Sequence, residues 1–252
     1  EINQSLTELN EVIFKEPSQI KYIYKENGGM HTAHNVAYEN IETELNVCID
    51  SDDCLAENAI DLILDFWDKS NHKNYAGIIG LDSDFDGNII GSDLGNITET
   101  TLSGFYANGG KGDKKLVYRT DIIKQYPPYP VFDGEKYVGL NYKYTLIDQD
   151  YKLLTLNKVL CNVEYQSDGS SNSMWRQYLN NPRGFAFLRK FYMKYNTSIL
   201  RNYIDSTHYV SSSILSRNCH FIRESPKKIL TKKQKSCKCN LYILKIIYNI
   251  YS

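Results

Sequence analysis

Two aspartates one residue apart are the clearest chemical signal in this chain of 252 residues. They belong to the run Asp50-Ser51-Asp52-Asp53, which follows the apolar segment Leu45–Ile49 that we expect to be a buried strand. Carboxylates leaving such a strand turn toward the crevice where open α/β sheets bind ligands. Hard oxygen donors suit Mn²⁺ or Mg²⁺, whose other positions are filled by phosphates and water. The run therefore predicts a metal and diphosphate site; the alternative is a solvated turn in which Asp53 caps the next helix.

The elements around this run are predicted to alternate between helices and strands. Apolar spacing indicates helices over His31–Glu39 and Leu55–Trp67, on either side of the acidic run, and Lys21–Tyr24 alternates like a strand. The other predictions are a helix over Gln4–Lys15, two strands within Ala76–Leu94, a strand over Lys115–Tyr118, helices over Thr120–Gln125 and Tyr142–Ile147, strands within Leu153–Tyr165, and mostly helix over Ser173–Ser225. This order indicates an α/β fold.

Composition limits the class of protein. The 29 basic and 30 acidic residues leave a formal charge of -1, which argues against a globally basic nucleic-acid binder, so we predict no nucleic-acid partner. The six cysteines form no disulfide framework, and no apolar stretch approaches the roughly 20 residues that span a bilayer. The first residues lack the order of a signal peptide. We therefore expect a cytoplasmic protein.

A glycine turn, Glu26-Asn27-Gly28-Gly29, lies between the predicted strand at Lys21–Tyr24 and the helix at His31–Glu39. The backbone amides of such a turn can approach a nucleotide or phosphate closely. A plain glycine-rich connector is the alternative. The presence of the acidic run further along the chain favours the ligand-binding interpretation.

Taken together, the motifs resemble those of family-two glycosyltransferases with a GT-A fold. The pair that carries this likeness is Tyr22-Ile-Tyr-Lys-Glu-Asn-Gly-Gly-Met-His-Thr-Ala-His-Asn35 and Val47-Cys-Ile-Asp-Ser-Asp-Asp-Cys-Leu55. Further similar motifs are Gly112-Asp-Lys, Val117-Tyr-Arg-Thr-Asp121, Phe132-Asp-Gly-Glu-Lys-Tyr-Val138, Asn162-Val-Glu-Tyr-Gln-Ser-Asp-Gly-Ser-Ser171 and Asn181-Pro-Arg-Gly-Phe185. The resemblance implies a Rossmann-like mixed sheet flanked by helices. We predict a catalytic GT-A domain over residues 1–172 and a helical C-terminal extension, with a basic and apolar tail, over residues 173–252.

The resemblance implies a hexosyl-type glycosyltransferase. Such enzymes move a sugar, usually with inversion, from a nucleoside-diphosphate donor, here expected to be UDP-linked, to a glycan or lipid-linked acceptor. Bacterial capsule or related surface polysaccharide assembly is the implied setting. By the same resemblance, Asp52 coordinates Mn²⁺ or Mg²⁺ between the phosphates, Asp50 reaches the ribose or the metal, and the nucleotide lies near Asn27, Gly28, Gly29, Asn35 and Ser51.

The catalytic base is marked less plainly. Many relatives carry an acidic residue a few positions after Gly-Glu-Lys, whereas this chain has Val138-Gly139-Leu140. Glu135 is therefore the first candidate for the carboxylate that deprotonates the acceptor hydroxyl, and Asp133 is the second. The alternative for Glu135 is a loop carboxylate that pairs with Lys136 or Arg119.

The family pattern also includes two earlier nucleotide-gripping motifs, Pro-Thr-Tyr-Asn and Asp-Asp-Gly-Ser, both of which would precede Glu1. A chain without them is expected to bind nucleotide poorly. A catalytically inactive carbohydrate-binding or scaffold relative is therefore an alternative function.

Two other metal sites compete with the acidic run. The segment Asp82-Ser-Asp-Phe-Asp-Gly-Asn-Ile-Ile-Gly-Ser-Asp93 nearly fits a calcium loop of the EF-hand type. Its flanks are strand-like or irregular, whereas an EF-hand needs helices, so we favour a hairpin turn and keep calcium binding as an alternative. His31 and His34 lie three apart on a predicted helix and are candidate zinc ligands. No third ligand is evident nearby, so we favour surface or phosphate-adjacent histidines.

The tail from Lys227 to Ser252 combines a cluster of lysines with a terminal apolar and aromatic run. Such a segment can bind anionic lipid headgroups, which would place the site near a lipid-linked acceptor. The alternative is a final helix that packs on the domain. A peripheral membrane contact is thus one of two predictions for the tail.

Overall fold

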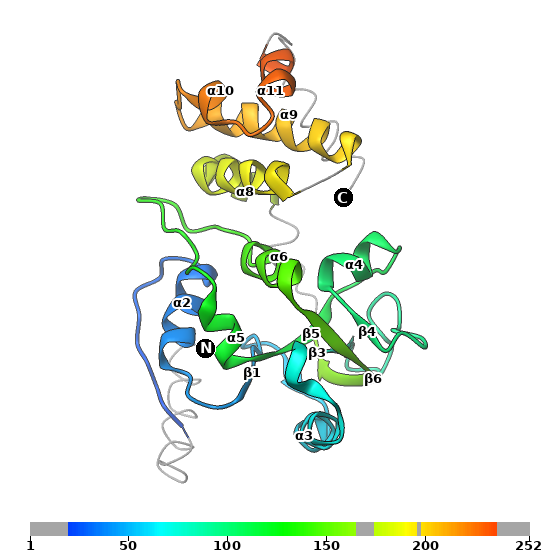
Figure 1. Cartoon of the computed structure of the whole chain (residues 1–252). Coiled ribbons are helices and arrows are strands. Elements are labelled where there is room, and N and C mark those ends of the chain that lie inside the picture. Colours follow the sequence, from blue (N-terminus) through cyan, green and yellow to red (C-terminus); the bar gives the residue numbers. More distant parts are fainter. Residues whose placement is uncertain (1–19, 165–173, 196–197, 236–252) are drawn as a thin grey trace.

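A computed structural model of the protein describes residues 20–164, 174–195 and 198–235 (Figure 1). The predicted helix over Gln4–Lys15 and the end of the tail lie outside the described residues. The core is a six-stranded mixed sheet with the order β1-β5-β3-β6-β2, to which β4 adds by pairing with β6. Its strands are β1 (Leu45–Val47), β2 (Cys54–Leu55), β3 (Tyr75–Ser83), β4 (Glu99–Thr100), β5 (Lys114–Arg119) and β6 (Lys152–Asn162).

The two long central strands fix the character of the sheet. β3 and β6 pair in parallel, whereas the other pairs between strands are antiparallel. From Ala76 to Ser83 every residue of β3 is buried, as expected for a central strand covered on both faces. The arrangement confirms the predicted mixed α/β sheet.

The helices cover the two faces of this sheet. Their bounds are α2 (Met30–Asn40), α3 (Ala59–Lys69), η1 (His72–Asn74), α4 (Leu102–Ala107), α5 (Thr120–Gln125), α6 (Asn141–Asp150), α7 (Met174–Asn180), α8 (Pro182–Tyr195), α9 (Ile199–Leu215), α10 (Phe221–Glu224) and α11 (Lys228–Lys235). Successive residues of a strand point to opposite faces. Accordingly, Ile78 packs with Trp67 of α3, while Ile79 belongs to the larger core on the other face, with Tyr118 and Ile123.

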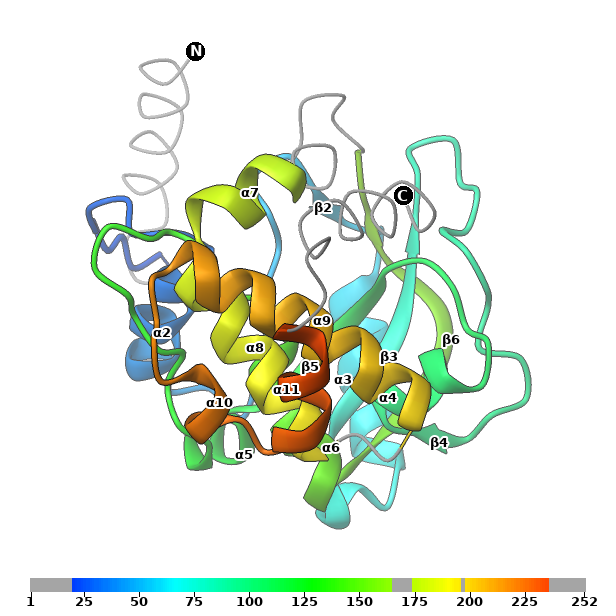
Figure 2. The ribbon, with the colours of Figure 1, turned by 90° about the horizontal axis from the view of Figure 1, so that it is seen from above.

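The helices from α8 onward form a second layer on the sheet domain. Viewed from above, α8, α9 and α11 lie over the sheet (Figure 2). Leu188 of α8 reaches the main core, and Phe191 contacts Tyr142 of α6 edge-on, with ring centroids 4.9 Å apart. Met193 and Tyr209 form a small separate core between α8 and α9. The helical extension is therefore packed firmly on the sheet domain. A domain boundary at residue 172 stays a prediction, because residues 165–173 are not described.

Three local predictions are corrected by the structure. Lys21–Tyr24 is not a strand: no strand pairs with it, and the side chain of Tyr24 is 76% exposed. Leu45–Ile49 contains the expected strand, but β1 is a half-buried edge strand rather than a buried one, because only β5 pairs with it. The second strand expected before Leu94 is reduced to a single bridge between Ser83 and Ile89.

The helix after the acidic run also begins later than predicted. Cys54 and Leu55 pair with β6 instead, and α3 starts at Ala59. Its N-cap residue is Asn58, so the prediction that Asp53 caps this helix is wrong.

Candidate functional site

A cleft of about 830 Å³ opens beside β1, β3 and β5, and we call it the acidic cleft. Six carboxylates and two lysines line it, so its formal charge is strongly negative. The carboxylates are Asp50, Asp52, Asp53, Asp82, Asp113 and Glu164, and the lysines are Lys114 and Lys115. Apart from Glu164, these residues come from segments that follow β1, end β3 or begin β5. Three residues of the acidic run predicted from the sequence, Asp50, Asp52 and Asp53, thus line this cleft, whereas Ser51 is not among its lining residues.

The acidic run forms a turn between β1 and β2. The backbone N–H of Asp53 donates to the carbonyl of Asp50 at 3.1 Å, and Asp50, Ser51 and Asp52 are exposed. Burial raises the pKa of Asp53, and the ammonium of Lys115 opposes this shift. The structure therefore places the carboxylates of Asp50 and Asp52 on one cleft wall, open to a ligand.

A buried ion pair forms another part of the wall. The Nζ atom of Lys115 lies 3.8 Å from a carboxylate oxygen of Asp82, the penultimate residue of β3. Burial raises the pKa of Asp82 to about 6, although Lys115 acts in the opposite direction. Burial lowers the pKa of Lys115, but Asp82 and Cys161 outweigh it, so the net shift is upward. A cation is thereby held beside the acidic run.

Lys114 has a structural role in the same wall. Its Nζ donates to the backbone carbonyls of Ile90 at 2.8 Å, Asp113 at 2.9 Å and Lys111 at 3.1 Å. These bonds close the loop before β5 and fix Asp113 at the cleft. The Gly112-Asp-Lys motif noted in the sequence thus contributes one carboxylate of the site.

The donor atoms around Asp50 and Asp52 fit a hard divalent cation that shares its coordination with a ligand. Within the described ranges, no three His, Cys, Asp or Glu side chains converge as metal ligands. Two carboxylates from the run, with phosphate oxygens and water, are the donor set that Mg²⁺ commonly takes when it binds with a nucleotide. Asp50 and Asp52 would hold such an ion. The metal assignment stays a prediction.

The two histidines of α2 are not arranged as a zinc pair, and both are buried rather than on the surface. The Nδ1 atom of His34 lies 3.0 Å from the hydroxyl of Tyr38, and its Nε2 lies 3.7 Å from the sulfur of Cys48. Both ring nitrogens of His31 are buried without a hydrogen-bond partner. Burial is the main cause that lowers the pKa of both histidines. Lys25 lowers the pKa of His31 further. At His34, Asp50 opposes the shift and Lys143 adds to it. Each is accordingly a neutral side chain in the packing of α2.

The glycine turn meets the loop at Lys136 rather than lining the acidic cleft. Gly29 has a φ of 94°, and a Cβ atom there would lie 1.9 Å from the carbonyl oxygen of Lys136. Asn27 accepts a hydrogen bond from the backbone N–H of Gly29 at 3.1 Å. The next residue, Met30, does line the cleft. Because Gly29 has no side chain, its backbone can lie against the backbone of Lys136 at the edge of the site.

Asn35 holds a neighbouring loop. Its amide nitrogen donates to the carbonyl of Tyr129 at 2.9 Å, and its amide oxygen accepts from the N–H of Tyr129 at 2.8 Å. This paired contact fixes the proline-rich segment over α2. Like Asn27, Gly28 and Gly29, Asn35 is not among the residues that line the acidic cleft. Contact of these four with a nucleotide stays a prediction.

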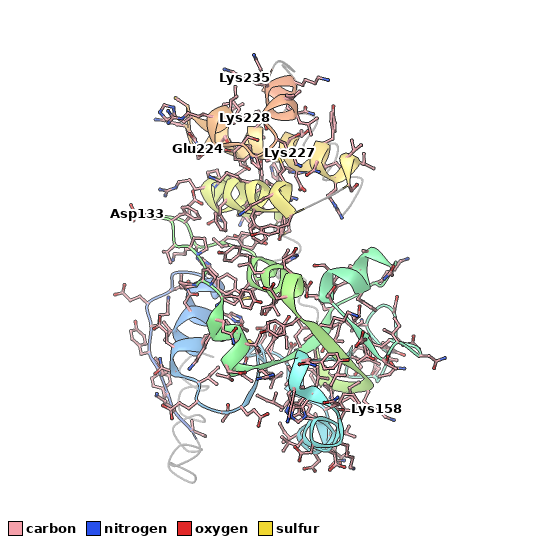
Figure 3. All side chains as sticks on the ribbon, viewed as in Figure 1. Asp133, Lys158, Glu224, Lys227, Lys228 and Lys235 are labelled. Carbon is pink, nitrogen blue, oxygen red and sulfur yellow. The ribbon has the colours of Figure 1, made fainter. Side chains whose placement is uncertain are left out.

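Glu135 is buried, and it binds the start of α8. Its carboxylate accepts hydrogen bonds from the backbone N–H groups of Arg183 at 3.0 Å and Gly184 at 2.8 Å. The Nε atom of Arg183 adds an ion pair at 3.0 Å. A carboxylate at a helix N-terminus is stabilised by the unpaired N–H groups there. Asp133 lies at the outer edge of the molecule (Figure 3). The structure therefore does not bring Glu135 or Asp133 to the acidic cleft. The ion-pair partner of Glu135 is Arg183, not Lys136 or Arg119 as the alternative predicted.

The segment that resembles a calcium loop is a hairpin turn, as favoured from its flanks. The carboxylate of Asp84 accepts from the N–H groups of Asp86 at 3.0 Å and Asn88 at 2.8 Å, and from the Asn88 amide at 2.9 Å. Gly87 has the positive φ of a tight turn, 85°. Asp82 is buried near Lys115 and lines the acidic cleft. The oxygen atoms of Asp84 are thus engaged within the turn.

Three further cleft residues were not predicted from the sequence. Tyr106 of α4, and Asn141 and Tyr144 of α6, also line the cleft. The hydroxyl of Tyr106 donates to the carbonyl of Gly112 at 3.0 Å, and the ring of Tyr144 stacks on Tyr118 at 5.3 Å between centroids. They share no spacing or motif, so their position depends on the packing of α4 and α6.

Comparison with known proteins agrees with this arrangement. Residues 3–126 match the sequence model of the family described as Glycosyl transferase family 2. The minor teichoic acid biosynthesis protein GgaB of Bacillus subtilis is 31% identical over 85 residues, which are 32% of this chain and 9% of that protein. The chain therefore spans only a small part of this relative.

The fold is also found among solved structures. The crystal structure of S. aureus TarS 1-349 in complex with UDP-GlcNAc superposes with a TM-score of 0.51 over 88% of this chain and 70% of that chain, at 14% identity. This likeness shows a shared fold. Residues 3–126 therefore belong to glycosyl transferase family 2, and the chain has the mixed α/β fold of the GT-A type.

Proposed function

We propose that the chain transfers a sugar from a nucleoside-diphosphate donor to a hydroxyl of a cell-surface glycan. The observation that carries this proposal is the acidic cleft, which presents Asp50 and Asp52 together on one wall of a family-two domain. GgaB is described as a teichoic acid biosynthesis protein, and TarS was crystallised with UDP-GlcNAc. These relatives support a UDP-linked donor and an acceptor of the teichoic acid or surface polysaccharide class.

The proposed reaction is a single displacement with inversion. The acceptor hydroxyl oxygen bonds to the anomeric carbon of the donor sugar, on the side opposite the diphosphate. The bond between that carbon and the phosphate oxygen breaks, and the nucleoside diphosphate leaves with the electron pair. The acceptor proton passes to a carboxylate within hydrogen-bond reach. Glycan and nucleoside diphosphate are the products, so the atoms balance.

The residues of the cleft fit the donor half of this reaction. Asp50 and Asp52 would hold Mn²⁺ or Mg²⁺, which when bound neutralises charge on the leaving diphosphate. Lys115, held beside the run by Asp82, supplies a fixed positive charge near the same position. Asp53 contributes to the turn that presents both ligands. We propose Mn²⁺ or Mg²⁺ as the cofactor on this basis.

The residue that accepts the proton of the acceptor hydroxyl is a separate question from the donor site. Glu135 stays the base predicted from the sequence, but its carboxylate would have to leave Arg183 and Gly184 to reach an acceptor. An inactive carbohydrate-binding relative is the second candidate function, and this engagement of Glu135 is the observation that favours it. Turnover of a UDP-sugar in the presence of an acceptor separates the two.

Calorimetry with UDP and UDP-GlcNAc, with Mn²⁺ and then with a chelator, tests the donor site. We expect binding that requires the metal and is lost in Asp52→Asn. The matched control is Asp68→Asn, because Asp68 is an exposed aspartate on α3 away from the cleft. Metal-independent binding, or equal binding by both variants, contradicts the proposed role of Asp52.

We also propose that the helical extension brings the enzyme to the inner face of a membrane. Lysines 227, 228 and 235 gather at the outer end of this layer (Figure 3). Among the residues described, none of the helices has the length and apolar character needed to cross a bilayer. Flotation with vesicles containing anionic lipid tests the contact: Lys228→Glu/Lys232→Glu should float less than the wild type, and equal flotation would refute it.

A further inference from the structure

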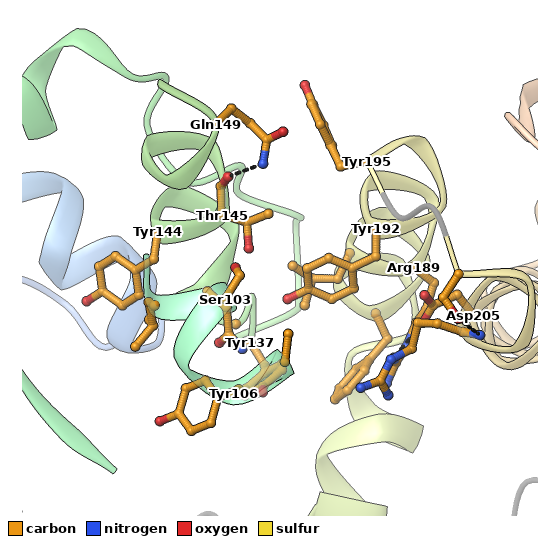
Figure 4. Close-up of a pocket in the computed structure, with 18 of the residues that line it drawn as sticks. Ser103, Tyr106, Tyr137, Tyr144, Thr145, Gln149, Arg189, Tyr192, Tyr195 and Asp205 are labelled. Carbon is orange, nitrogen blue, oxygen red and sulfur yellow. Dashed lines mark hydrogen bonds and ion pairs between the residues drawn. The ribbon is translucent and has the colours of Figure 1, made fainter. Parts of the chain in front are cut away.

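A second cavity, of about 700 Å³, lies between the sheet domain and the helical extension. We call it the tyrosine-arginine cavity. Its near wall is formed by α4 and α6, and its far wall by α8 and the start of α9 (Figure 4). Tyr192 and Tyr195 on α8 face Thr145 and Gln149 on α6 across it. Pockets between packed layers of this size commonly enclose a ligand.

This cavity adjoins the acidic cleft. Leu102, Tyr106, Asn141 and Tyr144 line both spaces. A chain lying in the tyrosine-arginine cavity would therefore direct one end along Tyr144 into the acidic cleft. That is the geometry required of an acceptor, because the reacting hydroxyl must meet the donor sugar while the remainder of the chain is bound elsewhere.

The walls of the cavity suit a chain rich in carbon and hydroxyl groups. Five tyrosines line it, and each offers an apolar ring face together with a hydroxyl. Burial raises the pKa of Tyr106, Tyr144 and Tyr192 to about 12 each, so these hydroxyls stay protonated near neutral pH. Neutral hydroxyls both donate and accept hydrogen bonds, as binding of a polyol or sugar requires.

The charge of this cavity is opposite to that of the acidic cleft. Its charged lining residues are Arg189, Arg201 and Asp205, which leave one formal positive charge. The Nη1 atom of Arg189 is paired with the buried carboxylate of Asp205 at 2.9 Å, which fixes the guanidinium at the wall. Arg201 stands on the first turn of α9, where it is exposed. Guanidinium groups bind phosphate oxygens with two parallel hydrogen bonds, so an anion is the complementary ligand.

We propose that the tyrosine-arginine cavity binds the acceptor, and that this acceptor is a polyol or glycan chain carrying phosphodiester groups. The tyrosine rings cover the carbon-hydroxyl units, and Arg201, which lines the same cavity as Arg189, binds a phosphodiester. This inference rests on the proposed function, because it assigns the second substrate of the same reaction.

The test is calorimetric binding to the full chain with three probes. They are a synthetic tetramer of glycerol phosphate, the uncharged tetrasaccharide maltotetraose, and inorganic phosphate. We expect the phosphate tetramer to bind at least about tenfold more tightly than maltotetraose, which lacks the anion that an arginine binds. We expect the same minimum ratio over inorganic phosphate, which lacks the carbon-hydroxyl units that cover the tyrosine rings. Equal binding of maltotetraose would overturn the anionic assignment, and equal binding of inorganic phosphate would overturn the assignment to a chain.

Two arginine variants locate the site. Arg201→Ala should weaken binding of the phosphate tetramer about tenfold, and Arg201→Lys should recover part of the loss because it keeps the charge. The matched control is Arg223→Ala, since Arg223 is an equally exposed arginine on α10 outside the cavity. An unchanged affinity in Arg201→Ala, or an equal loss in Arg223→Ala, would overturn the proposal.

Donor binding by the wild-type chain separates this inference from the proposed function. If the tetramer binds through Arg201 while UDP-GlcNAc fails to bind with Mn²⁺, the anion site stands and the donor assignment fails. If UDP-GlcNAc binds and the tetramer does not, the donor assignment stands and the acceptor inference is refuted.

Discussion

The acidic cleft and the tyrosine-arginine cavity meet at Tyr106, Asn141 and Tyr144, yet they differ in charge and in construction. Six carboxylates line the first, whereas two arginines and one aspartate are the charged residues of the second. A negative wall attracts a cation that can carry a diphosphate, and a positive wall attracts an anionic chain. Under the proposed function, this difference in charge directs the two substrates to separate, adjoining spaces.

The two spaces also differ in what holds their shape. The acidic cleft is built on turns and strand ends of a single sheet, with Lys114 and Lys115 locking the β5 end. The tyrosine-arginine cavity depends on how the helical extension packs on α4 and α6. Glu135 connects the layers, because it joins the loop after α5 to the start of α8. Changes that loosen the layers should therefore affect the second space first.

The largest expected effect comes from the acidic cleft. Asp52→Asn should lower kcat/KM for transfer by roughly 100-fold or more, because it removes a ligand of the ion that stabilises the leaving diphosphate. Binding of the glycerol phosphate tetramer should stay unchanged, since Asp52 lines only the acidic cleft. Steady-state kinetics and calorimetry on the same preparation measure both effects.

Asp68→Asn is the matched control for this comparison. It removes one carboxylate from an exposed position on α3 and should leave both kinetics and tetramer binding as in the wild type. If Asp52→Asn weakens tetramer binding as strongly as transfer, the two spaces are not separate sites.

The next effect concerns the connection between the layers. Glu135→Gln should lower the free energy of unfolding by about 1 to 3 kcal/mol, because a buried carboxylate that binds two backbone N–H groups and Arg183 loses its charge. Thermal or denaturant unfolding measures this loss. The smaller change expected in Asp133→Asn, at an exposed position, provides the control.

Kinetics of the same variant decide the role of Glu135 in catalysis. If Glu135→Gln unfolds at the same midpoint as the wild type but loses two or more orders of magnitude in kcat, Glu135 is the base and its structural role is contradicted. A lowered unfolding midpoint in Glu135→Gln, with a similar loss of stability in Arg183→Ala, would instead show that both residues hold the loop after α5 to the start of α8.

The sequence predicted the acidic cleft far better than the cavity beside it. The acidic run, the Gly112-Asp-Lys motif and helix α5 are local features, and each forms as its spacing indicates. Lys21–Tyr24 fails because alternation alone cannot supply a partner strand. The contact of Glu135 with the start of α8 could not be predicted from the residues around Glu135, because its partners Arg183 and Gly184 are far along the chain.

The tyrosine-arginine cavity had no sequence signal of its own. Its lining comes from α4, α6, α8 and α9, which share no repeat or motif. The chain has 21 tyrosines, and composition does not show that five of them line one cavity. Such a site depends on tertiary packing and is visible only when the helices are placed.

A moderate effect should appear in the helical layer as the pH falls. Burial lowers the pKa of His208 on α9 to about 3, with Arg189 acting in the same direction. Because the unfolded chain has the ordinary value of 6.5, it binds more protons than the folded chain between about pH 6.5 and 3. The free energy of unfolding should therefore fall with pH across this window, by on the order of 1 kcal/mol per unit.

Denaturant unfolding at pH 7.5, 6.0 and 5.0 measures this slope. His208→Gln should flatten it, whereas His220→Gln, at an exposed position, should leave it unchanged. His31 and His34 also have a lowered pKa, so part of the slope should persist in the first variant. An identical slope in wild type and His208→Gln would rule out His208 as a cause.

The smallest expected effect tests the cavity at a single hydroxyl. Tyr192→Phe removes a phenol from the wall of the tyrosine-arginine cavity while keeping its ring. One net hydrogen bond is worth about 0.5 to 1.5 kcal/mol, so KM for the acceptor should rise about two- to tenfold. The KM for the UDP-sugar and kcat should stay near the wild-type values, because Tyr192 does not line the acidic cleft. Tyr203→Phe, whose side chain is 52% exposed on α9, is the matched control. A rise in the donor KM instead would place Tyr192 with the donor and reverse the assignment of the two spaces.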